Sequence, residues 1–243
     1  MSRIRRATVV FLLCNFLALS GALRAAGTVF VVGGVGGLDP IQACAPWMLP
    51  KAGVPHKIEV FTWTHGKCRL LRDLQDIRYL LAQADRLAVA VRAAQAREPG
   101  QPIYLLGHSA GTGVILAAAE KLPPASVERI ILLSPAVSPT YDLRPALRAT
   151  RLQVVSFNST YDRFCLDLCT SVFGTVDRVY GPAAGLDGFQ VPPDLDEEGR
   201  QLYQRLVQVP WHLEMVLKCT DGSHHGTCMP IFLAHMVAPW LMP

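Results

Sequence analysis

One serine of this chain lies between two glycines in the segment Gly107-His-Ser-Ala-Gly111. The apolar run Ile103–Leu106 before it predicts a buried strand, and Gly113–Lys121 after it predicts a helix. A strand, a sharp turn and a helix in this order expose a serine hydroxyl at the end of the strand, and the glycines leave room for the turn. The spacing therefore predicts that Ser109 is a nucleophile. The alternative is a turn serine that only caps the helix.

A serine hydroxyl is a weak nucleophile and needs a base beside it. Two adjacent histidines, His224 and His225, lie in the glycine-flanked late loop 221–227. We prefer His224 as the base because it leaves more residues before the next expected helix, and His225 stays open as the alternative. His108 lies within the serine turn, where it is expected to pack or to hydrogen-bond locally.

An acid must orient the base, and it should lie between the serine and the histidine along the chain. Asp162 is the preferred acid because it follows the expected strand Leu152–Phe157, and sites in parallel sheets gather at the carboxyl ends of strands. The alternative for Asp162 is a surface ion pair with Arg163. Asp187 is a weaker rival for the same role.

The negative charge that develops on a substrate oxygen needs hydrogen-bond donors. One predicted donor is the backbone N–H of Ala110, directly after the serine. The second should come from the glycine cluster Gly33–Gly37 after the expected strand Thr28–Val32, and Val35 is the predicted donor. The glycines do not fit a dinucleotide-binding loop, because the third glycine would fall at Asp39, and no lysine followed by serine or threonine completes a phosphate-binding loop.

Strand-like apolar runs alternate with helical patterns along most of the chain. This alternation predicts an α/β protein with one domain, built on a mostly parallel sheet with helices on both faces. Strands are expected at Thr28–Val32, Lys57–Trp63, Ile103–Leu106, Arg129–Leu133 and Leu152–Phe157, and helices at Pro40–Met48, Leu70–Val91, Gly113–Lys121 and Ile231–Leu241. Beyond these, the weaker patterns favour a strand at Val176–Tyr180, a helix at Leu195–Val207 and a strand at His212–Leu217.

The composition agrees with one globular domain. The chain has 243 residues, of which 51% are hydrophobic, and this is enough for a single large core. Charged residues make up only 17%, which argues against a disordered chain and against a nucleic-acid partner. Part of the formal charge of +4 comes from arginines at the very start of the chain, so it indicates a targeting segment.

The first 22 residues have the layout of a signal peptide. A basic stretch, Met1–Arg6, precedes an apolar run, Ala7–Leu19, and Ser20 and Ala22 fit the small-x-small rule for cleavage after Ala22. We therefore expect a signal peptide at residues 1–22 and a mature domain at residues 23–243, secreted or periplasmic. A retained membrane anchor is the alternative, which would allow association with a membrane.

Six further cysteines follow the one in the targeting segment. An even set in an exported chain predicts disulfides, and closeness along the chain favours the pairs Cys44–Cys68, Cys165–Cys169 and Cys219–Cys228. A zinc site is disfavoured because the chain has no Cys-x-x-Cys pair. No metal and no organic cofactor are expected.

Taken together, these residues resemble the α/β-hydrolase superfamily from Thr28 to about Leu241. The resemblance rests on Gly107–Gly111, on Gly33–Gly37, on Asp162 and on the His224-His225 loop. It departs from the usual pattern in having Gly33-Gly34 where His-Gly is common, and the early strands of many members are absent. The resemblance implies acyl transfer to water through an acyl-serine intermediate, without fixing the acyl group.

The resemblance also bears on substrate access. Only residues 134–151 separate the strand after the serine helix from the acid strand, too few for a large cap domain. We therefore expect an open, cutinase-like cleft, although residues 181–210 have the length for a smaller flap. The expected function is hydrolysis of a small-molecule or lipid carboxylic ester. Thioester or peptide hydrolysis and a non-catalytic binding role are the alternatives.

Overall fold

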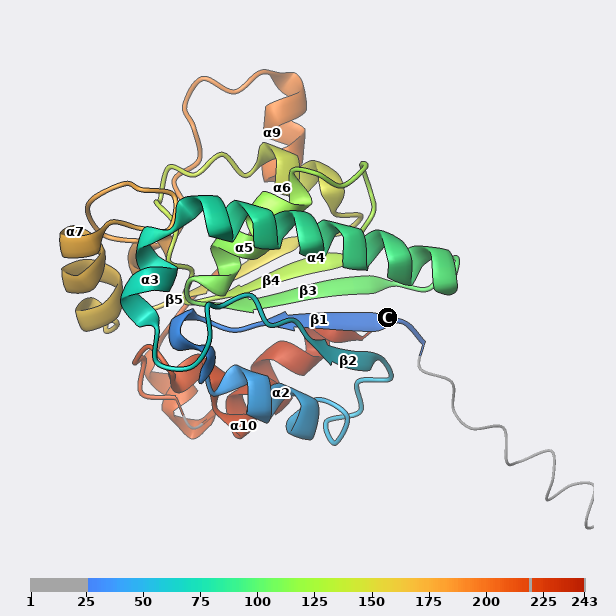
Figure 1. Ribbon diagram of the computed structural model, residues 1–243, viewed down its shortest axis with the longest axis horizontal. Helices are drawn as coiled ribbons and strands as arrows, with labels where there is room; N and C mark the ends of the chain where they lie inside the picture. The colour runs from blue at the N-terminus through green and yellow to red at the C-terminus, as the bar shows by residue number, and fades with distance from the viewer. Residues whose placement is uncertain (1–25, 219, 243) are drawn as a thin grey trace, which may run out of the picture.

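A six-stranded parallel sheet forms the centre of the molecule in the computed structural model, which describes residues 26–218 and 220–242 (Figure 1). The strand order is β2-β1-β3-β4-β5-β6, and every neighbouring pair is parallel. The strands are β1 (Thr28–Val32), β2 (Lys57–Val60), β3 (Ile103–His108), β4 (Arg129–Leu133), β5 (Val154–Asn158) and β6 (Leu206–Pro210). The predicted α/β class with a parallel sheet is confirmed.

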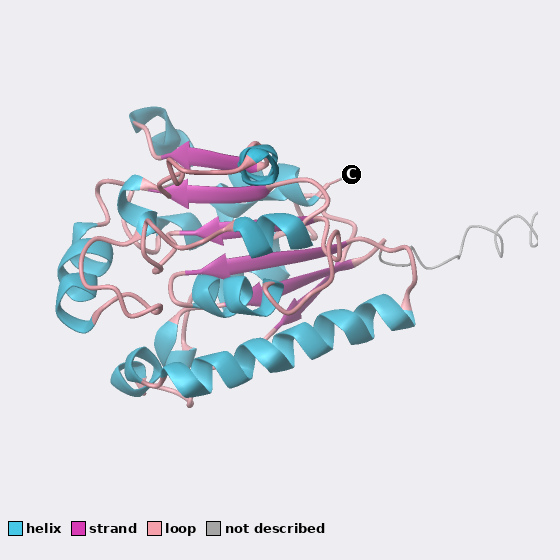
Figure 2. Cartoon of the chain, turned by 90° about the horizontal axis from the view of Figure 1, so that it is seen from above, coloured by secondary structure: helices cyan, strands magenta, loops and turns pink. Residues whose placement is uncertain are grey.

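Helices cover both faces of the sheet, and all strands run in one direction (Figure 2). One face carries α4 (Ile77–Arg97), α5 (Gly111–Ala119), α6 (Arg144–Ala149) and α9 (Glu197–Tyr203), and the other carries α2 (Ile41–Met48) and α10 (Pro230–Phe232). The side chains of successive β1 residues point alternately to the two faces of the sheet. Phe30 and Val32 pack under α4 and α5, whereas Val29 and Val31 pack under α2.

The expected helix Leu70–Val91 is interrupted in the structure. It forms α3 (Leu70–Gln75) and α4, which are separated at Asp76. The Asp76 carboxylate accepts a hydrogen bond from the N–H of Tyr79 at 2.9 Å and so caps the start of α4. The apolar spacing continues through the break, so periodicity alone did not reveal it. Because of the break, α3 does not continue the axis of α4 and lies near the carboxyl ends of the strands.

The late part of the chain differs most from the prediction. The last strand is β6 and not His212–Leu217, because Leu213–Lys218 forms a 3-10 helix. Residues 176–180 form a turn without a strand. Leu206 and Val207, the first two residues of β6, were predicted as the end of a helix because their spacing is ambiguous, and pairing with β5 decides their conformation. The final apolar segment is helical as expected, from α10 to Leu241, in three short pieces.

Two of the predicted disulfides do not form, and Cys44, Cys68, Cys165 and Cys169 are free thiols. Cys165 and Cys169 lie four residues apart on one helical segment, Phe164–Cys169. That spacing puts Cβ atoms about 5–6 Å apart, whereas a disulfide requires about 3.8 Å. Cys44 packs with α2 against one face of the sheet, whereas Cys68 is exposed in the loop before α3.

Other predictions fall on residues that are not described. The expected signal segment, residues 1–22, lies outside the described residues. So does Cys219, and its predicted partner Cys228 is a buried free thiol. Within residues 26–218 and 220–242, no helix combines the length and the apolar character needed to cross a membrane.

Candidate active site

Ser109 lies on a sharp turn between β3 and α5, at the carboxyl edge of the sheet. Its φ of 53° is in the left-handed region, which is unusual for a residue other than glycine. The turn also brings α5 close to β1. A Cβ on Gly111 would lie 2.4 Å from the carbonyl oxygens of Val32 and Gly33, so only glycine fits there. The predicted strand, turn and helix around Ser109 are confirmed.

The structure brings Ser109, His224 and Asp162 into one hydrogen-bonded chain. His224 Nε2 lies 2.8 Å from Ser109 Oγ, and His224 Nδ1 lies 2.5 Å from Asp162 Oδ2. Asp162 is buried in the loop after β5, and His224 lies in the loop before the 3-10 turn Gly226–Cys228. With Nδ1 donating to the carboxylate, Nε2 is free to accept the serine proton.

The rival residues occupy other positions. His225 is exposed and lines the same cleft, but its ring makes no hydrogen bond to Ser109 or to Asp162. Asp187 is exposed on α8 (Ala184–Asp187). Arg163 pairs with Asp167, at 3.9 Å, and not with Asp162. Among the candidates raised from the sequence, His224 and Asp162 are the two whose side chains form a chain with the serine.

The environment of His224 favours its neutral form. Burial is the largest cause, and it lowers the pKa of the ring below its ordinary value. The hydrogen bond that His224 donates to Asp162 raises the pKa, and His108 and His225 add to the lowering. A neutral imidazole at neutral pH can take a proton from a hydroxyl, which a general base requires.

The glycine loop after β1 is held by two buried carboxylates. Asp39 Oδ2 accepts the N–H of Gly34 at 2.6 Å, and Asp73 Oδ2 accepts the N–H of Gly36 at 2.8 Å. Gly34 also lies against the serine, because a Cβ built on it would be 3.1 Å from Ser109 Cβ. The loop backbone is therefore fixed on both sides of Val35.

This arrangement leaves two backbone donors beside the serine. The N–H groups of Val35 and Ala110 donate to no other group among the described residues. Both residues line the cleft that contains Ser109. Their positions suit the donor roles expected from the sequence, and the neighbouring amides of the loop are already occupied.

Sequence reasoning did not find the roles of Asp39, Asp73 and His108. Asp39 was noted only because it breaks a glycine pattern. Asp73 lies 37 residues after Gly36 along the chain, and no local signal connects them. Asp73 also accepts from the backbone and the ring of His65, both at 2.8 Å, so it ties the start of α3 to the glycine loop.

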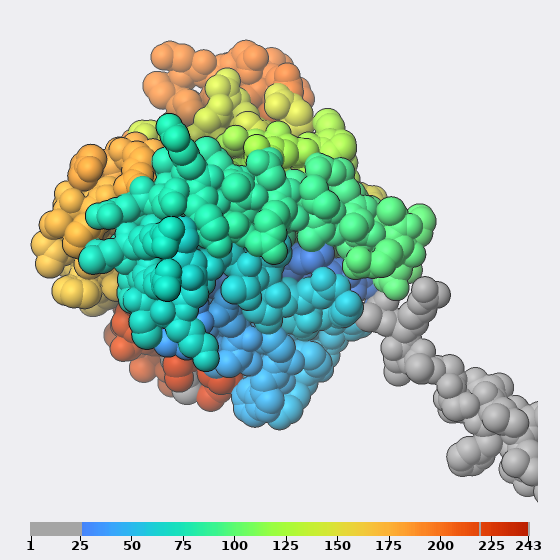
Figure 3. Space-filling model, viewed as in Figure 1, coloured from blue at the N-terminus to red at the C-terminus, as the bar shows by residue number. Residues whose placement is uncertain are grey.

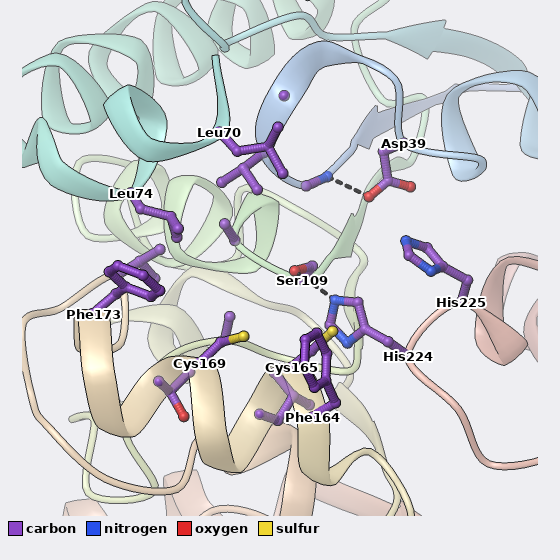
Figure 4. A pocket seen from close by; sticks show the side chains of 18 of the residues that line it. Asp39, Leu70, Leu74, Ser109, Phe164, Cys165, Cys169, Phe173, His224 and His225 are labelled. Carbon is purple, nitrogen blue, oxygen red and sulfur yellow. Dashed lines mark hydrogen bonds between the residues drawn. The ribbon is translucent and has the colours of Figure 1, made fainter. Parts of the chain in front are cut away.

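An apolar cleft of about 390 Å³ opens beside Ser109 (Figure 4). One wall comes from the glycine loop and α3, and the other comes from the segment between Phe164 and Val176, which includes α7 (Thr170–Phe173). In the space-filling view, α3 (teal) and the segment between Phe164 and Val176 (gold) lie at the same end of the molecule (Figure 3). The apolar side chains that line the cleft include Leu38, Leu70, Leu74, Phe164, Leu166 and Phe173.

Within residues 26–218 and 220–242, no large cap covers the cleft. The segment 134–151 forms a loop and α6, and none of its residues except Ala136 lines the cleft. Residues 181–210, the possible flap, contribute nothing to the lining. The expectation of a cleft without a cap domain agrees with the structure, but its second wall comes from the segment after β5, which the sequence did not point to.

Two trios of side chains near the site have metal-ligand types with ligand atoms within 4.8 Å of one another: Asp39, His108 and Cys228, and Asp162, Cys165 and His224. In both trios the histidine already uses both ring nitrogens in hydrogen bonds. Neither ring offers a free lone pair to a metal ion unless one of these bonds breaks.

Comparison with known proteins finds one matching family model and several similar solved structures. A family model described as serine aminopeptidase, S33, matches residues 73–163, a stretch that contains Ser109 and Asp162. No curated protein matches the sequence. Lipase B from Aspergillus fumigatus is similar in structure, with a TM-score of 0.51 and 13% identity, over 90% of this chain and 53% of that one. A lipase-esterase related protein from Clostridium acetobutylicum has a TM-score of 0.49 and 13% identity, over 90% of this chain and 94% of that one.

The likeness to lipase B concerns the fold. The chain has the α/β-hydrolase fold that the resemblance noted in the sequence implies. At 13% identity the likeness concerns the fold, so the reaction has to be argued from the site itself.

Proposed function

We propose that this protein is a serine hydrolase that cleaves carboxylic esters with an apolar acyl chain. The observation that carries the proposal is the hydrogen-bonded chain from Ser109 Oγ through His224 to Asp162, which opens onto an apolar cleft. A nucleophile, a base and an orienting acid in this order are the parts that acyl transfer to water requires.

The reaction follows from the positions of these atoms. Ser109 Oγ attacks the ester carbonyl carbon while His224 Nε2 takes the hydroxyl proton, and the N–H groups of Val35 and Ala110 donate to the oxyanion. The tetrahedral intermediate collapses, His224 returns the proton to the leaving alkoxide, and an alcohol departs. Water then attacks the acyl-serine with His224 as the base again. The acid is released and Ser109 is restored.

The cleft supports an ester with an apolar acyl group as the substrate. Its lining is dominated by leucine, phenylalanine, cysteine and glycine. Of the described residues that line it, Asp39 is the one acidic residue, and its carboxylate is paired with His108. A free amino terminus, which an aminopeptidase must hold, therefore finds no spare carboxylate there. This favours ester over peptide hydrolysis, in spite of the name of the matching family model.

A fluorophosphonate probe and a series of esters test the proposal. The probe should label Ser109, and the protein should hydrolyse p-nitrophenyl octanoate. Ser109→Ala should abolish labelling and lower kcat by about 10⁴-fold or more. Ser126→Ala is the matched control, because Ser126 lies in the turn after α5, where it bonds the backbone of Pro123. Absence of labelling in the folded protein would disprove the proposal and favour a binding role.

The N-terminal segment belongs to the same proposal. Residues 1–22 would direct export and be removed after Ala22, so that the hydrolase acts outside the cytoplasm or at a membrane. Sequencing the N-terminus of the protein recovered from an exporting host should find Leu23 first. Recovery of the intact N-terminus from the membrane fraction would support the anchor instead.

A further inference from the structure

A second histidine–carboxylate pair lies directly beneath the site. His108 precedes the serine and is fully buried at the end of β3. Its Nδ1 lies 2.6 Å from Asp39 Oδ2, and its Nε2 lies 2.9 Å from the backbone oxygen of His224. The mechanism above uses neither His108 nor Asp39, although both contact parts that it does use.

Both partners of the His108 ring are hydrogen-bond acceptors. A neutral imidazole has one donor and one acceptor nitrogen, so it satisfies only one of the two contacts. The imidazolium, with an N–H on each side, satisfies both. Burial opposes this charge, but Cys228 and Asp39 beside the ring hold the pKa of His108 well above its ordinary value. The pKa of Asp39 is lowered despite its burial, chiefly by His108.

The pair connects three separate pieces of the site. Asp39 accepts the N–H of Gly34 at 2.6 Å, in the loop that presents Val35, and its other oxygen accepts the N–H of Ile41 at 3.0 Å. His108 is joined by the chain to Ser109 and by its ring to the carbonyl of His224. Figure 4 shows Asp39 bonded to the glycine loop, close to the serine turn.

We propose that Asp39 and His108 form a buried ion pair that positions the base loop and the oxyanion loop relative to Ser109. The proposal rests on the proposed function and adds two positioning residues to it. The imidazolium bridges Asp39 and the His224 carbonyl with donors on opposite sides. A glutamine at position 108 has a single amide group and cannot reach both partners, so it would release one of the two loops.

The pair also acts on the base through its charge. The ring of His108 lies 4.9 Å from the ring of His224 between centroids, and its positive charge lowers the pKa of that base. The other titratable groups that face His224 are Asp162, His225 and Cys165. Asp162 raises the pKa of His224, and the His108 charge counteracts this effect. If the His108 charge is lost, the pKa of His224 rises and the base stays protonated to a higher pH.

Steady-state kinetics of His108→Gln, Asp39→Asn and the double variant test the pair. Each single variant should lower kcat by about 10- to 100-fold, because a small misplacement of catalytic groups is costly, with KM changed by less than about 2-fold. The double variant should be no slower than the worse single variant, because the two residues act as one unit. The acid limb of kcat/KM should shift to higher pH in all three, which a loss of stability alone would not produce.

His56→Gln is the matched control, because His56 is also buried but lies against Tyr104 at the other end of β3. It should change the melting temperature without moving the acid limb. If His108→Gln and Asp39→Asn behave like His56→Gln in an active protein, the positioning role is wrong and the proposed function stands. If the unaltered protein reacts neither with the fluorophosphonate probe nor with esters, the positioning role and the proposed function are both wrong.

A measurement on the unaltered protein does not depend on how the variants fold. Nitrogen NMR of the histidine rings should show His108 with protons on both nitrogens at pH 7 to 8, while His224 carries one. A neutral His108 ring in that range would overturn the proposed ion pair.

Discussion

Ser109 is held in a backbone conformation that a serine rarely adopts. The left-handed φ costs on the order of 1–3 kcal/mol, and neighbouring contacts fix it. The Ser109 N–H donates to the carbonyl of Leu133 at 3.0 Å, which extends the β-ladder, and the Ser109 carbonyl accepts the hydroxyl of Thr112 at 2.5 Å. This strained conformation directs the Ser109 hydroxyl toward His224 and away from the core.

The first prediction concerns the acid. Asp162→Asn keeps the size of the side chain but presents an amide to His224 Nδ1, which favours the wrong tautomer of the ring. We expect kcat for an octanoyl ester to fall by about 10³- to 10⁴-fold. Asp187→Asn, at the exposed last residue of α8, should leave kcat within about 2-fold. Equal losses in the two variants would contradict the assignment of Asp162.

The second prediction is a pH profile. Burial lowers the pKa of His224 below its ordinary value of 6.5. In the proposed mechanism, the neutral ring is the active form. Since the base is lost only as pH falls through this lowered pKa, kcat/KM should still exceed half of its plateau at pH 6.5 and decline further below it. A midpoint of the acid limb above 6.5, measured with a neutral ester, would show that the site does not favour the neutral ring.

Residue types and their order along the chain predicted Ser109, Asp162 and His224, because each role demands a particular chemistry at a particular stage of the fold. The preference for His224 over His225 rested on a small difference in loop length, since ring direction depends on how the loop is packed. The contact of Asp39 with His108 could not be predicted from the sequence, for another reason. Its partner His108 is 69 residues away, and only the pairing of β1 with β3 brings them together.

At the scale of elements, the cleft has two walls with different origins. One wall includes α3, which exists as a separate helix because Asp76 caps α4. The other is the helical segment from Phe164 to α7, which follows directly after Asp162. The same loop therefore carries the proposed acid and one wall of the cleft, so we expect changes in this segment to affect specificity and catalysis together.

The third prediction concerns the length of the acyl chain. Leu74 lies on α3 and lines the cleft, and Leu74→Trp fills space there. We expect kcat/KM for octanoyl esters to fall by about 10-fold or more, with acetyl esters changed by less than about 2-fold. Leu71→Trp, on the same helix but outside the cleft lining, is the control. Equal effects on both esters would show that the acyl chain binds elsewhere.

Elements were predictable where local pattern and burial agree. β1 and β4 are buried apolar runs, and their bounds are the predicted ones. β6 was missed because it lies at the edge of the sheet, where its alternation is incomplete and only β5 defines it. The divided helix was missed because the capping aspartate sits within an unbroken apolar spacing.

At the scale of the whole molecule, the described fold is stabilised by packing and hydrogen bonds. Two extensive apolar layers, one on each face of the sheet, bury most of the large side chains. The cysteines that are described are spread between them and the cleft, and none is bonded to another. A core of this size suffices for a domain of this length.

The fourth prediction follows from those thiols. Alkylation of the unfolded protein without prior reduction, followed by peptide mapping, should modify Cys44, Cys68, Cys165, Cys169 and Cys228. Added reductant should leave the melting temperature unchanged within about 1 °C, because no described cross-link is lost. A peptide that joins Cys44 to Cys68 would contradict the structure and restore the pairing expected from the sequence.

The order of the strands has a consequence for how the molecule assembles. β1 lies between β2 and β3, and Thr28 pairs with Ile103, so the centre of the sheet cannot close until a long stretch of chain is available. Parallel pairings of this kind form slowly, because the chain loses loop-closure entropy before the contacts between the strands stabilise it. The strand that carries the glycine loop therefore stays open to wrong partners for much of folding. Chaperones and slow synthesis should raise the yield of this protein more than a change in its surface would.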